Sequence, residues 1–327
     1  MVFIPESGAM NTFFGDILMK NTIPLTSLIL FMMASTVIAQ ESEPPASYQI
    51  GNATLYRIED TASGFSADVF PTVEKATFDK YATDGKIPSS VSAFLLKVPD
   101  KRRNSANEPE SDYILIDAGM GAPNGKLFAN LGKAMPGGYQ PEKIIVVWIT
   151  HSHGDHIGGL LNGDARRFPK AKVLCSKLEY EHWNKQNNAA LERIKKVYGD
   201  DFRAVDTFDE AMIVTNADHP EVITPLNAVG HTPGHTVFLI ESEGEKLMVV
   251  GDLLHAAALQ FPVPEACARY DMDQAEAVQA RRRILDKAAG ENIPVAGIHF
   301  PNPGIGFVKK NANGGYDFTP IRLSPEK

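Results

Sequence analysis

Cysteine is scarce in this sequence of 327 residues, which holds only Cys175 and Cys267. A chain of this length buries a full hydrophobic core without cross-links, so the sequence is not a disulfide scaffold. Cys175 lies in an apolar, strand-like run. We expect two separate buried thiols. One bridge between them stays open as an alternative, because a sequence does not show whether two sulfur atoms meet.

Basic residues are also in the minority, with 32 Lys and Arg against 40 Asp and Glu and a net charge of −8. Nucleic acids select basic surfaces, so we expect no nucleic-acid partner. The short run Arg281-Arg282-Arg283 falls in a helical stretch, and we interpret it as a solvated helix face. The Gly-x-Ser-x-Gly elbow of serine hydrolases is absent from the sequence, which gives no indication of a serine nucleophile.

One long apolar run stands near the start, from Ile23 to Ile38, with Lys20 before it. The run ends in a small-residue site at Ala39, where polar residues follow, and this layout is typical of a signal peptide. We therefore predict a signal peptide over residues 1–39 and a mature domain over residues 40–327, secreted or periplasmic, with no stable membrane anchor. Met19 is an alternative start of translation. The alternative to a cleaved signal peptide is that the apolar run stays in place as a membrane anchor.

Strand-like and helical stretches interleave through the rest of the chain without a linker. Ile144 to Ile149 is continuously apolar and β-branched, a pattern that favours a strand buried on both faces. Helices are expected over Gly125–Met135, Ser176–Tyr198 and Asp273–Ala289, the last with an Asp273-x-x-Glu276 capping pattern. We predict one α/β (α+β) domain built as an αββα sandwich, with two mixed sheets face to face and helices outside.

The most informative segment follows the buried strand directly and reads Thr150-His151-Ser152-His153-Gly154-Asp155-His156. On extended backbone, residues two apart point the same way, so His151 and His153 can face one metal ion. The turn at Gly154 then directs Asp155 and His156 to a second point. Three imidazoles and a carboxylate are costly to bury without a metal, and this ligand set suits Zn, Mn, Fe or Co.

This HxHxDH segment after a buried strand resembles the metallo-β-lactamase superfamily. The superfamily pattern has three further ligands, and the sequence offers a match for each: His235 after Pro233-Gly234, Asp252 after Gly251, and His299 after Ile298. Asp117-Ala118-Gly119 is similar to the early Asp-x-Gly turn of the superfamily. The resemblance implies that His151, His153 and His235 bind one ion, that Asp155, His156 and His299 bind another, and that Asp252 bridges them. We expect His231 to support a ligand rather than bind metal.

The resemblance also implies a mechanism and two divalent ions as cofactors, with Zn expected first and Mn, Fe or Co open. A hydroxide bridging the ions would attack a carbonyl carbon or a phosphorus, while one ion stabilises the developing oxyanion. Asp155 lies beside that hydroxide in the superfamily, and it is the expected catalytic proton carrier.

Gly251 to Phe261, together with the late segment Gly297 to Gly306, is similar to the methyl parathion hydrolase and lactonase branch of the superfamily. That branch implies an exported enzyme that cleaves lactones, aryl esters or organophosphate triesters, with a small-molecule substrate and a homodimeric assembly. We expect an apolar substrate pocket, with core packing as the alternative for the tryptophan, lined by Trp183, Leu254, His255, Leu259 and Phe261. Some lactonases carry Tyr at the position of His255, so the lactonase pattern is not fully met.

Two other functions stay open. A β-lactamase-like or thioester hydrolase would use the same site, although a bridging Asp252 speaks against the periplasmic β-lactamases. A metal-dependent binding protein without catalysis is the alternative outside enzymes.

Overall fold

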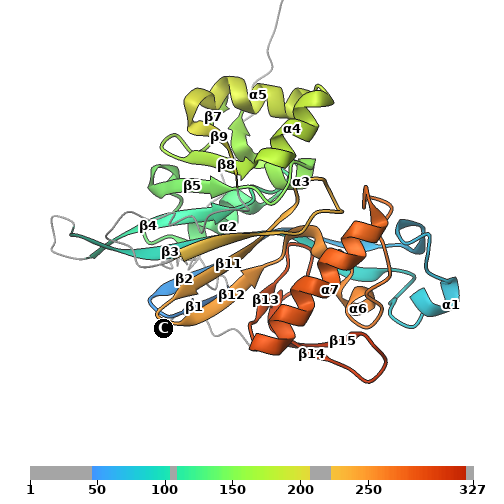
Figure 1. Cartoon of the computed structure of the whole chain (residues 1–327). Helices are drawn as coiled ribbons and strands as arrows, with labels where there is room; N and C mark the ends of the chain where they lie inside the picture. Colours follow the sequence, from blue (N-terminus) through green and yellow to red (C-terminus); the bar gives the residue numbers. More distant parts are fainter. Residues whose placement is uncertain (1–45, 104–108, 207–221, 322–327) are drawn as a thin grey trace, which may run out of the picture. The chain divides into compact units, whose positions relative to one another are not determined.

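The computed structural model describes residues 46–103, 109–206 and 222–321 (Figure 1). The signal peptide predicted for residues 1–39 lies outside this part. The described chain forms two main sheets and a small two-stranded ladder, β6 (Leu161–Asn162) with β7 (Ala165–Arg166).

The first sheet is built from the N-terminal half of the domain. Its described strands follow the order β1-β2-β3-β4-β5-β8-β9, antiparallel up to β4 and parallel from β4 to β9. The bounds are β1 (Ser47–Ile50), β2 (Ala53–Phe65), β3 (Ile87–Arg103), β4 (Pro109–Ile116), β5 (Ile144–Trp148), β8 (Lys172–Ser176) and β9 (Phe202–Val205).

The second sheet comes from the C-terminal half, in the order β10-β11-β12-β13-β14-β15 among the described strands. All its neighbours are antiparallel except β12 and β13. The bounds are β10 (Val222–Asn227), β11 (Thr236–Ser242), β12 (Glu245–Val249), β13 (Val295–Ala296), β14 (Ile305–Lys310) and β15 (Tyr316–Pro320).

The two sheets pack face to face, and their shared core includes Trp148 and Leu96 from the first sheet and Phe238 and Val249 from the second. Helices α2 (Leu127–Ala134) and α5 (Ala189–Tyr198) cover the outer face of the first sheet. Helix α7 (Gln274–Glu291) covers the outer face of the second (Figure 1). These four layers confirm the predicted αββα sandwich.

Strand β5 shows why its sequence is apolar throughout. Val147 faces the helical layer, whereas Val146 and Trp148 face the other sheet. Because a parallel strand at the centre of a sandwich is covered on both faces, no position along it favours a polar residue. The buried strand predicted from the sequence is therefore confirmed.

The helix expected over Ser176–Tyr198 is two helices, which corrects that prediction. Helix α4 (Lys177–Lys185) ends before Asn187, which has a positive φ of 51°, and α5 begins after Asn188. The Asn188 side chain accepts the backbone N–H of Leu191 and so caps the second helix. Asparagine tolerates the left-handed conformation and is a good N-cap residue, so the pair Asn187-Asn188 separates two helices where one was expected.

The capping pattern predicted before α7 is confirmed, because the Asp273 carboxylate accepts the backbone N–H of Glu276 at 2.9 Å. Two short helices, α1 (Lys75–Phe78) and α6 (Ala257–Gln260), lie close together, since Phe78 packs with Leu259. A third short helix, α3 (Gly154–Ile157), follows the histidine-rich loop. No helix in the described ranges is long and apolar enough to cross a membrane.

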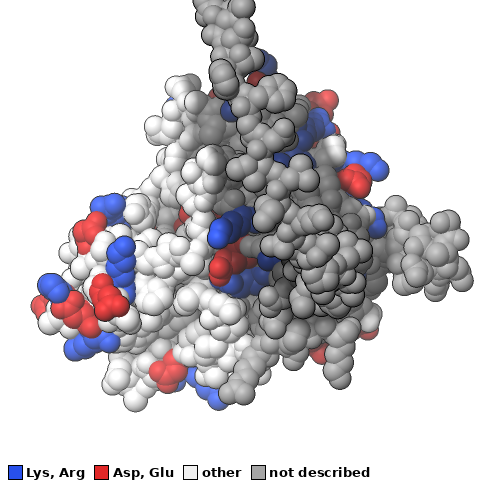
Figure 2. All heavy atoms as spheres, turned by 180° about the vertical axis from the view of Figure 1, so that it is seen from behind, with Lys and Arg blue, Asp and Glu red and all other residues white. Residues whose placement is uncertain are grey.

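Cys175 and Cys267 are both buried and unbridged, as expected. At the surface, acidic and basic side chains are interspersed over the described part of the face in Figure 2. Exposed pairs such as Lys75 with Asp79, 2.6 Å apart, add little to stability, because water and salt screen them.

Asp60 is a buried carboxylate that ties β2 to the segment leading into α2. Its two oxygens accept the backbone N–H groups of Met120 and Leu127, each at 2.7 Å, and its side chain leaves no room for a Cβ atom at Gly125. The first turn of α2 is therefore anchored by a residue far away in the sequence.

We predict that Asp60→Ala lowers the free energy of unfolding by about 3 kcal/mol, because two buried N–H groups lose a charged acceptor. Urea unfolding should show a lower midpoint with an unchanged m-value. Asp79→Ala, which removes an exposed carboxylate, is the control and should change stability by less than about 0.5 kcal/mol. Equal effects of the two substitutions would contradict the anchoring role of Asp60.

Candidate active site

The chemically active side chains all follow the ends of strands at one edge of the sandwich. The loop after β5 supplies His151 and His153, and α3 supplies Asp155 and His156. From the second sheet, the loop before β11 carries His231 and His235, the short 3-10 helix η5 (Gly251–Leu253) after β12 carries Asp252, and the turn after β13 carries His299.

A first group consists of His151, His153 and His231. His153 Nδ1 lies 2.9 Å from His151 Nε2 and 3.0 Å from His231 Nε2, and the two Nε2 atoms are 3.2 Å apart. These three nitrogens and an Asp252 oxygen lie within 4.8 Å of one another. Such convergence of imidazole nitrogens is the arrangement expected of metal ligands.

A second group consists of Asp155, His156 and His299, whose ligand atoms also lie within 4.8 Å of one another. Asp155 Oδ2 is 3.7 Å from His156 Nε2 and 3.6 Å from His299 Nε2. Asp252 lies between the two groups: its Oδ1 is 3.1 Å from His156 Nε2, and its Oδ2 is 3.3 Å from His231 Nε2.

For His156, His231 and His299, the other ring nitrogen lies within hydrogen-bond distance of an acceptor. His156 Nδ1 donates to Asp117 Oδ2 at 2.7 Å, and His231 Nδ1 donates to Asp271 Oδ1 at 2.9 Å. His299 Nδ1 donates to the carbonyl of Ser90 at 2.8 Å. With Nδ1 of His156, His231 and His299 facing an acceptor, the Nε2 atoms of these three rings point into the cluster, whereas His153 faces it through Nδ1.

Although burial opposes it, nearby carboxylates, Asp252 first, raise the pKa of His156 and of His299, so the site favours positive charge, which fits divalent ions. Within the described ranges, His156 Nε2 and Asp252 Oδ1 are buried and form no hydrogen bond, although they lie 3.1 Å from each other. Burial lowers the pKa of His231 to about 4, so its imidazole is neutral at physiological pH. Burial opposes ionisation of Asp252, but the surrounding histidines, His156 first, hold its pKa well below the usual value. Neutral imidazoles and ionised carboxylates are the forms that bind metal.

The structure contradicts the ligand role predicted for His235. Its Nδ1 donates to the carbonyl of Ala228 at 3.0 Å, and its Nε2 accepts the backbone N–H of Asp252 at 2.9 Å. With both nitrogens engaged, the ring holds the Asp252 backbone in place, and His231 takes its position in the first group. The motif Gly-His-Thr-Pro-Gly-His offers two histidines four residues apart, and the sequence alone favoured the wrong one.

Glu179 is a buried carboxylate that the sequence did not single out. It accepts the backbone N–H of Ser152 at 2.7 Å and the Thr232 hydroxyl at 2.6 Å, so it joins the two loops that carry the first group. It also accepts the indole N–H of Trp183 at 2.6 Å. The Trp183 ring contacts His153 edge-on, with centroids 5.5 Å apart, and helps to fix that ligand.

A pocket of about 370 Å³ opens onto the cluster. Apart from the ligand residues and Gly154, its lining consists of Phe65, His255 and Tyr270. His255 is 2% exposed, stacks on His299 with ring centroids 5.3 Å apart, and has no hydrogen-bond partner for either ring nitrogen. The pocket role predicted for His255 agrees with this placement.

The other predicted pocket residues do not line this pocket. Leu254 packs in the core beneath α7, and Leu259 packs against Phe70 and Phe78. Phe261 stacks on Phe318 with centroids 4.7 Å apart. The chain turns these apolar side chains inward after Asp252, and hydrophobicity does not distinguish a core position from a pocket wall.

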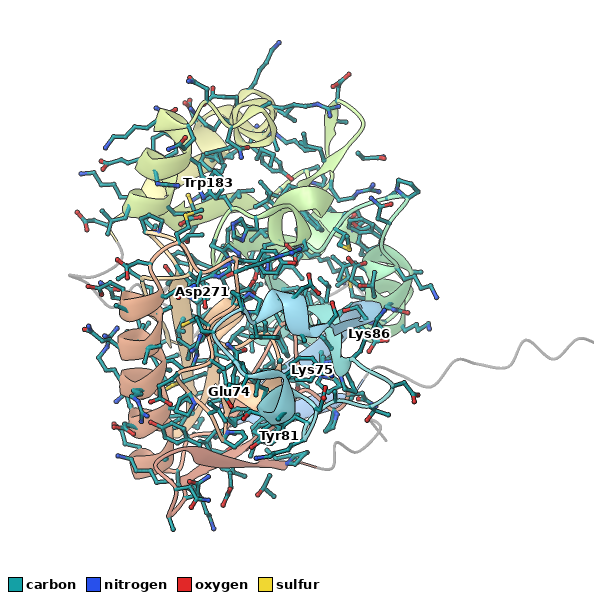
Figure 3. The ribbon with its side chains drawn as sticks, turned by 90° about the vertical axis from the view of Figure 1, so that its right-hand side faces the viewer. Glu74, Lys75, Tyr81, Lys86, Trp183 and Asp271 are labelled. Carbon is teal, nitrogen blue, oxygen red and sulfur yellow. The ribbon has the colours of Figure 1, made fainter. Side chains whose placement is uncertain are left out.

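Figure 3 shows the side of the molecule on which Trp183 of α4 and Asp271 of the loop before α7 lie, above Glu74 and Tyr81 in this view. Trp183 supports His153 from behind rather than lining the pocket.

The solvated face predicted for Arg281-Arg282-Arg283 is wrong for its first member, since Arg281 is fully buried.

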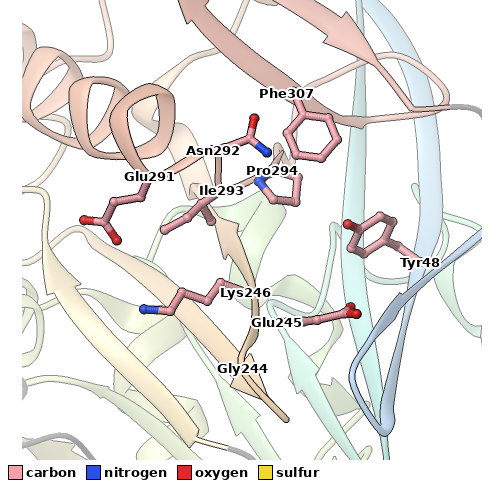
Figure 4. A pocket seen from close by; sticks show the side chains of 9 residues that line it. All are labelled: Tyr48, Gly244, Glu245, Lys246, Glu291, Asn292, Ile293, Pro294 and Phe307. Atoms are coloured by element: carbon pink, nitrogen blue, oxygen red, sulfur yellow. The ribbon is translucent and has the colours of Figure 1, made fainter.

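A second depression of about 470 Å³ lies between the start of β12 and the end of α7 (Figure 4). Its charged side chains are Glu245, Lys246 and Glu291, and Lys246 pairs with Glu241 at 2.9 Å. None of the clustered histidines lines it, so the chemistry concentrates in the first pocket.

Comparison with known proteins agrees with this geometry. The chain is 28% identical over 196 residues to the uncharacterized protein YobT of Bacillus subtilis (strain 168), covering 55% of this chain and 76% of that protein. Two solved structures each show 25% identity and a TM-score of 0.71 over 86% of this chain and 99% of theirs. They are the hydrolase AbOPH of the beta lactamase superfamily and AidC, a dizinc quorum-quenching lactonase in complex with a product. The sequence profile of the Metallo-beta-lactamase superfamily matches residues 108–294, more than half of the chain, and the protein belongs to that superfamily.

Proposed function

We propose that this chain is an exported hydrolase that holds two divalent ions and cleaves neutral lactones and aryl esters, with organophosphate triesters as further substrates. The observation that carries the proposal is the Asp252 carboxylate, which lies between two groups of ligands with an oxygen close to each. A carboxylate in that position can bridge two ions. Zn²⁺ is the ion proposed first, because imidazole and carboxylate are its common ligands.

His151, His153 and His231 would hold one ion, and Asp155, His156 and His299 the other, with Asp252 shared. When bound, the ions would supply a nucleophilic water at neutral pH and stabilise negative charge on the substrate oxygen. The protein contributes the fixed arrangement of lone pairs, because the Nδ1 partners prevent the rings from turning.

Two side chains of the pocket can act on the substrate directly. The Asp155 side chain is 30% exposed, and although burial opposes it, nearby His156 and His299 lower its pKa, so it is ionised and could accept a proton from the attacking water and pass that proton to the leaving oxygen. Among the described residues, neither buried ring nitrogen of His255 has a hydrogen-bond partner, although its Nε2 lies 3.2 Å from Asp252 Oδ2, and one of the two nitrogens can donate to a substrate carbonyl or phosphoryl oxygen.

The lining of the pocket favours neutral substrates. Among the described residues that line it there is no Lys or Arg, whereas Phe65 and Tyr270 provide aromatic surface. A β-lactam antibiotic carries a carboxylate away from its reactive ring, and that charge would meet no cationic side chain here. The β-lactamase alternative is therefore the weaker one, and a thioester hydrolase would need an equally neutral substrate.

The likeness to AidC, named as a lactonase, and to AbOPH, named as a hydrolase, supports this choice of reaction. The apolar run before Ala39 supports export, and a homodimer stays a prediction by analogy. A metal-dependent binding protein without catalysis stays the alternative outside enzymes, because Asp155 would also serve there as a metal ligand.

The two histidines of the Gly-His-Thr-Pro-Gly-His segment should behave differently when replaced. We expect His231→Asn to bind about one metal ion fewer per chain, because it removes a converging lone pair. His235→Gln, which can still donate and accept toward the backbone, should keep its metal but unfold more easily. Metal content after dialysis, measured by elemental analysis, decides between them. Metal loss in His235→Gln alone would restore the assignment made from the sequence.

Substrate preference tests the proposed reaction. Metal-loaded protein should hydrolyse dihydrocoumarin faster than methyl paraoxon, and both faster than a chromogenic cephalosporin. Asp252→Ala should reduce each rate by on the order of 100-fold or more, because the two ligand groups lose their shared carboxylate. A cephalosporin rate above the lactone rate would favour the β-lactamase-like alternative, and stoichiometric metal without any hydrolysis would favour the binding protein.

His255→Phe keeps the ring stack on His299 and removes both ring nitrogens. We expect kcat/KM for the lactone to fall by roughly 10- to 100-fold, with metal content unchanged. Steady-state kinetics and elemental analysis of the same preparation provide the measurement. If the substitution instead removes an ion, His255 is a ligand rather than a substrate contact.

A further inference from the structure

Arg281 is a fully buried arginine on the inner face of α7. Its helical neighbours on that face, Ala277, Ala280 and Leu285, are apolar and buried. The next residue, Arg282, is partly exposed and pairs with Glu265 at the surface. A single position within the basic run therefore projects a guanidinium into the interior, where burying a charge is costly unless it is fully paired.

The guanidinium contacts the segment that follows Asp252 and the loop that leads to Asp271 and α7. Its Nε donates to the carbonyl of Leu253 at 2.7 Å, and Leu253 directly follows Asp252. Its Nη1 donates to the carbonyls of Pro264 and Ala266 at 2.7 and 3.1 Å. These bonds join the segment after β12 to the loop that leads into α7.

The remaining nitrogen of the guanidinium faces Asp271. Arg281 Nη2 lies 3.6 Å from Asp271 Oδ2, which also accepts the backbone N–H of Ala268 at 3.0 Å. The other oxygen of Asp271 accepts the proton of His231 Nδ1. One rigid fork thus contacts the backbone next to Asp252 and the carboxylate that orients His231.

An apolar side chain at this position would fill the space without a desolvation cost. What it would lack is a planar set of N–H donors at fixed angles. A planar guanidinium fixes two segments relative to each other, because a movement of either segment breaks its contact with the same rigid group.

We propose that Arg281 is a positioning residue that sets the place of Asp252 relative to His231, through the Leu253 carbonyl on one side and the Asp271 carboxylate on the other. The inference rests on the metal site of the proposed function. Without the guanidinium, Asp252 and His231 can still bind metal, but their positions relative to each other are no longer fixed. The ion that they share then binds more weakly.

The test compares Arg281→Met with Arg283→Met in the full-length protein. Arg283 is exposed on the same helix, so its substitution controls for loss of a charge from α7. We expect Arg281→Met to weaken Zn²⁺ binding at least about 10-fold, in the range of substitutions behind metal ligands, and to shift the absorption bands of the Co²⁺-loaded protein. Arg283→Met should change neither quantity. Competition with a chromogenic chelator measures the affinity.

Thermal unfolding without metal separates positioning from general stability. A lower Tm in Arg281→Met with wild-type zinc affinity and cobalt spectrum would overturn the proposal, because the arginine would then be only structural. If Arg281→Met does not fold, Arg281→Lys and Asp271→Asn decide: weaker zinc binding in both supports the proposal, and wild-type affinity in both overturns it.

A double-mutant cycle adds a second check. Because Arg281 is proposed to act partly through Asp271, the effects of Arg281→Met and Asp271→Asn on zinc affinity should be less than additive. Strict additivity would overturn that route. Absence of zinc binding by the wild-type protein would overturn the proposed function itself, whereas unchanged binding in the variants overturns only the role of Arg281.

Discussion

A carboxylate surrounded by imidazoles is the constraint on which this structure depends. Asp252 is 3% exposed, and His151, His156, His231, His255 and His299 each place an Nε2 atom within 3.7 Å of its oxygens. Acceptors so close together repel unless a cation or a proton lies between them. The surrounding chain has to hold this arrangement against repulsion, and most of the polar interior of the domain serves that purpose.

The support is built outward in layers. Asp117 and Asp271 fix the rings of His156 and His231, and the Ser90 carbonyl fixes that of His299. Behind these lie two buried arginines. Arg57 donates to the Ser90 hydroxyl at 2.9 Å and to the carbonyl of the residue after His299 at 3.1 Å, as Arg281 does beside Asp252. Behind each ligand group there is therefore a guanidinium. This group keeps its charge, and its N–H donors have fixed directions.

The sequence predicts those parts of the fold and of the site that depend on residues close together in the chain. The strand and loop ending in His156 form one contiguous pattern, so both the sandwich and most of the ligand set could be predicted from it. The roles of His231 and His235 could not, because they depend on which ring nitrogen meets the Asp252 backbone. Arg281 resembled its exposed neighbours in every local respect, and only the packing of α7 distinguishes it.

Phe65 and Tyr270, which line the pocket, also could not be predicted from the sequence around the ligands. Phe65 lies at the end of β2, far in sequence from the ligands, yet its ring contacts both His255 and His299 edge-on, with centroids 6.0 and 5.8 Å apart. Apolar residues close to Asp252 in sequence instead complete the core that keeps its segment in place. Since most residues next to the buried Asp252 are needed for packing, with His255 as the exception, much of the pocket wall comes from other elements. Of these elements, β2 reaches a metal-binding residue directly through the contact of Phe65 with His299, so the pocket wall and the ligand groups are packed together.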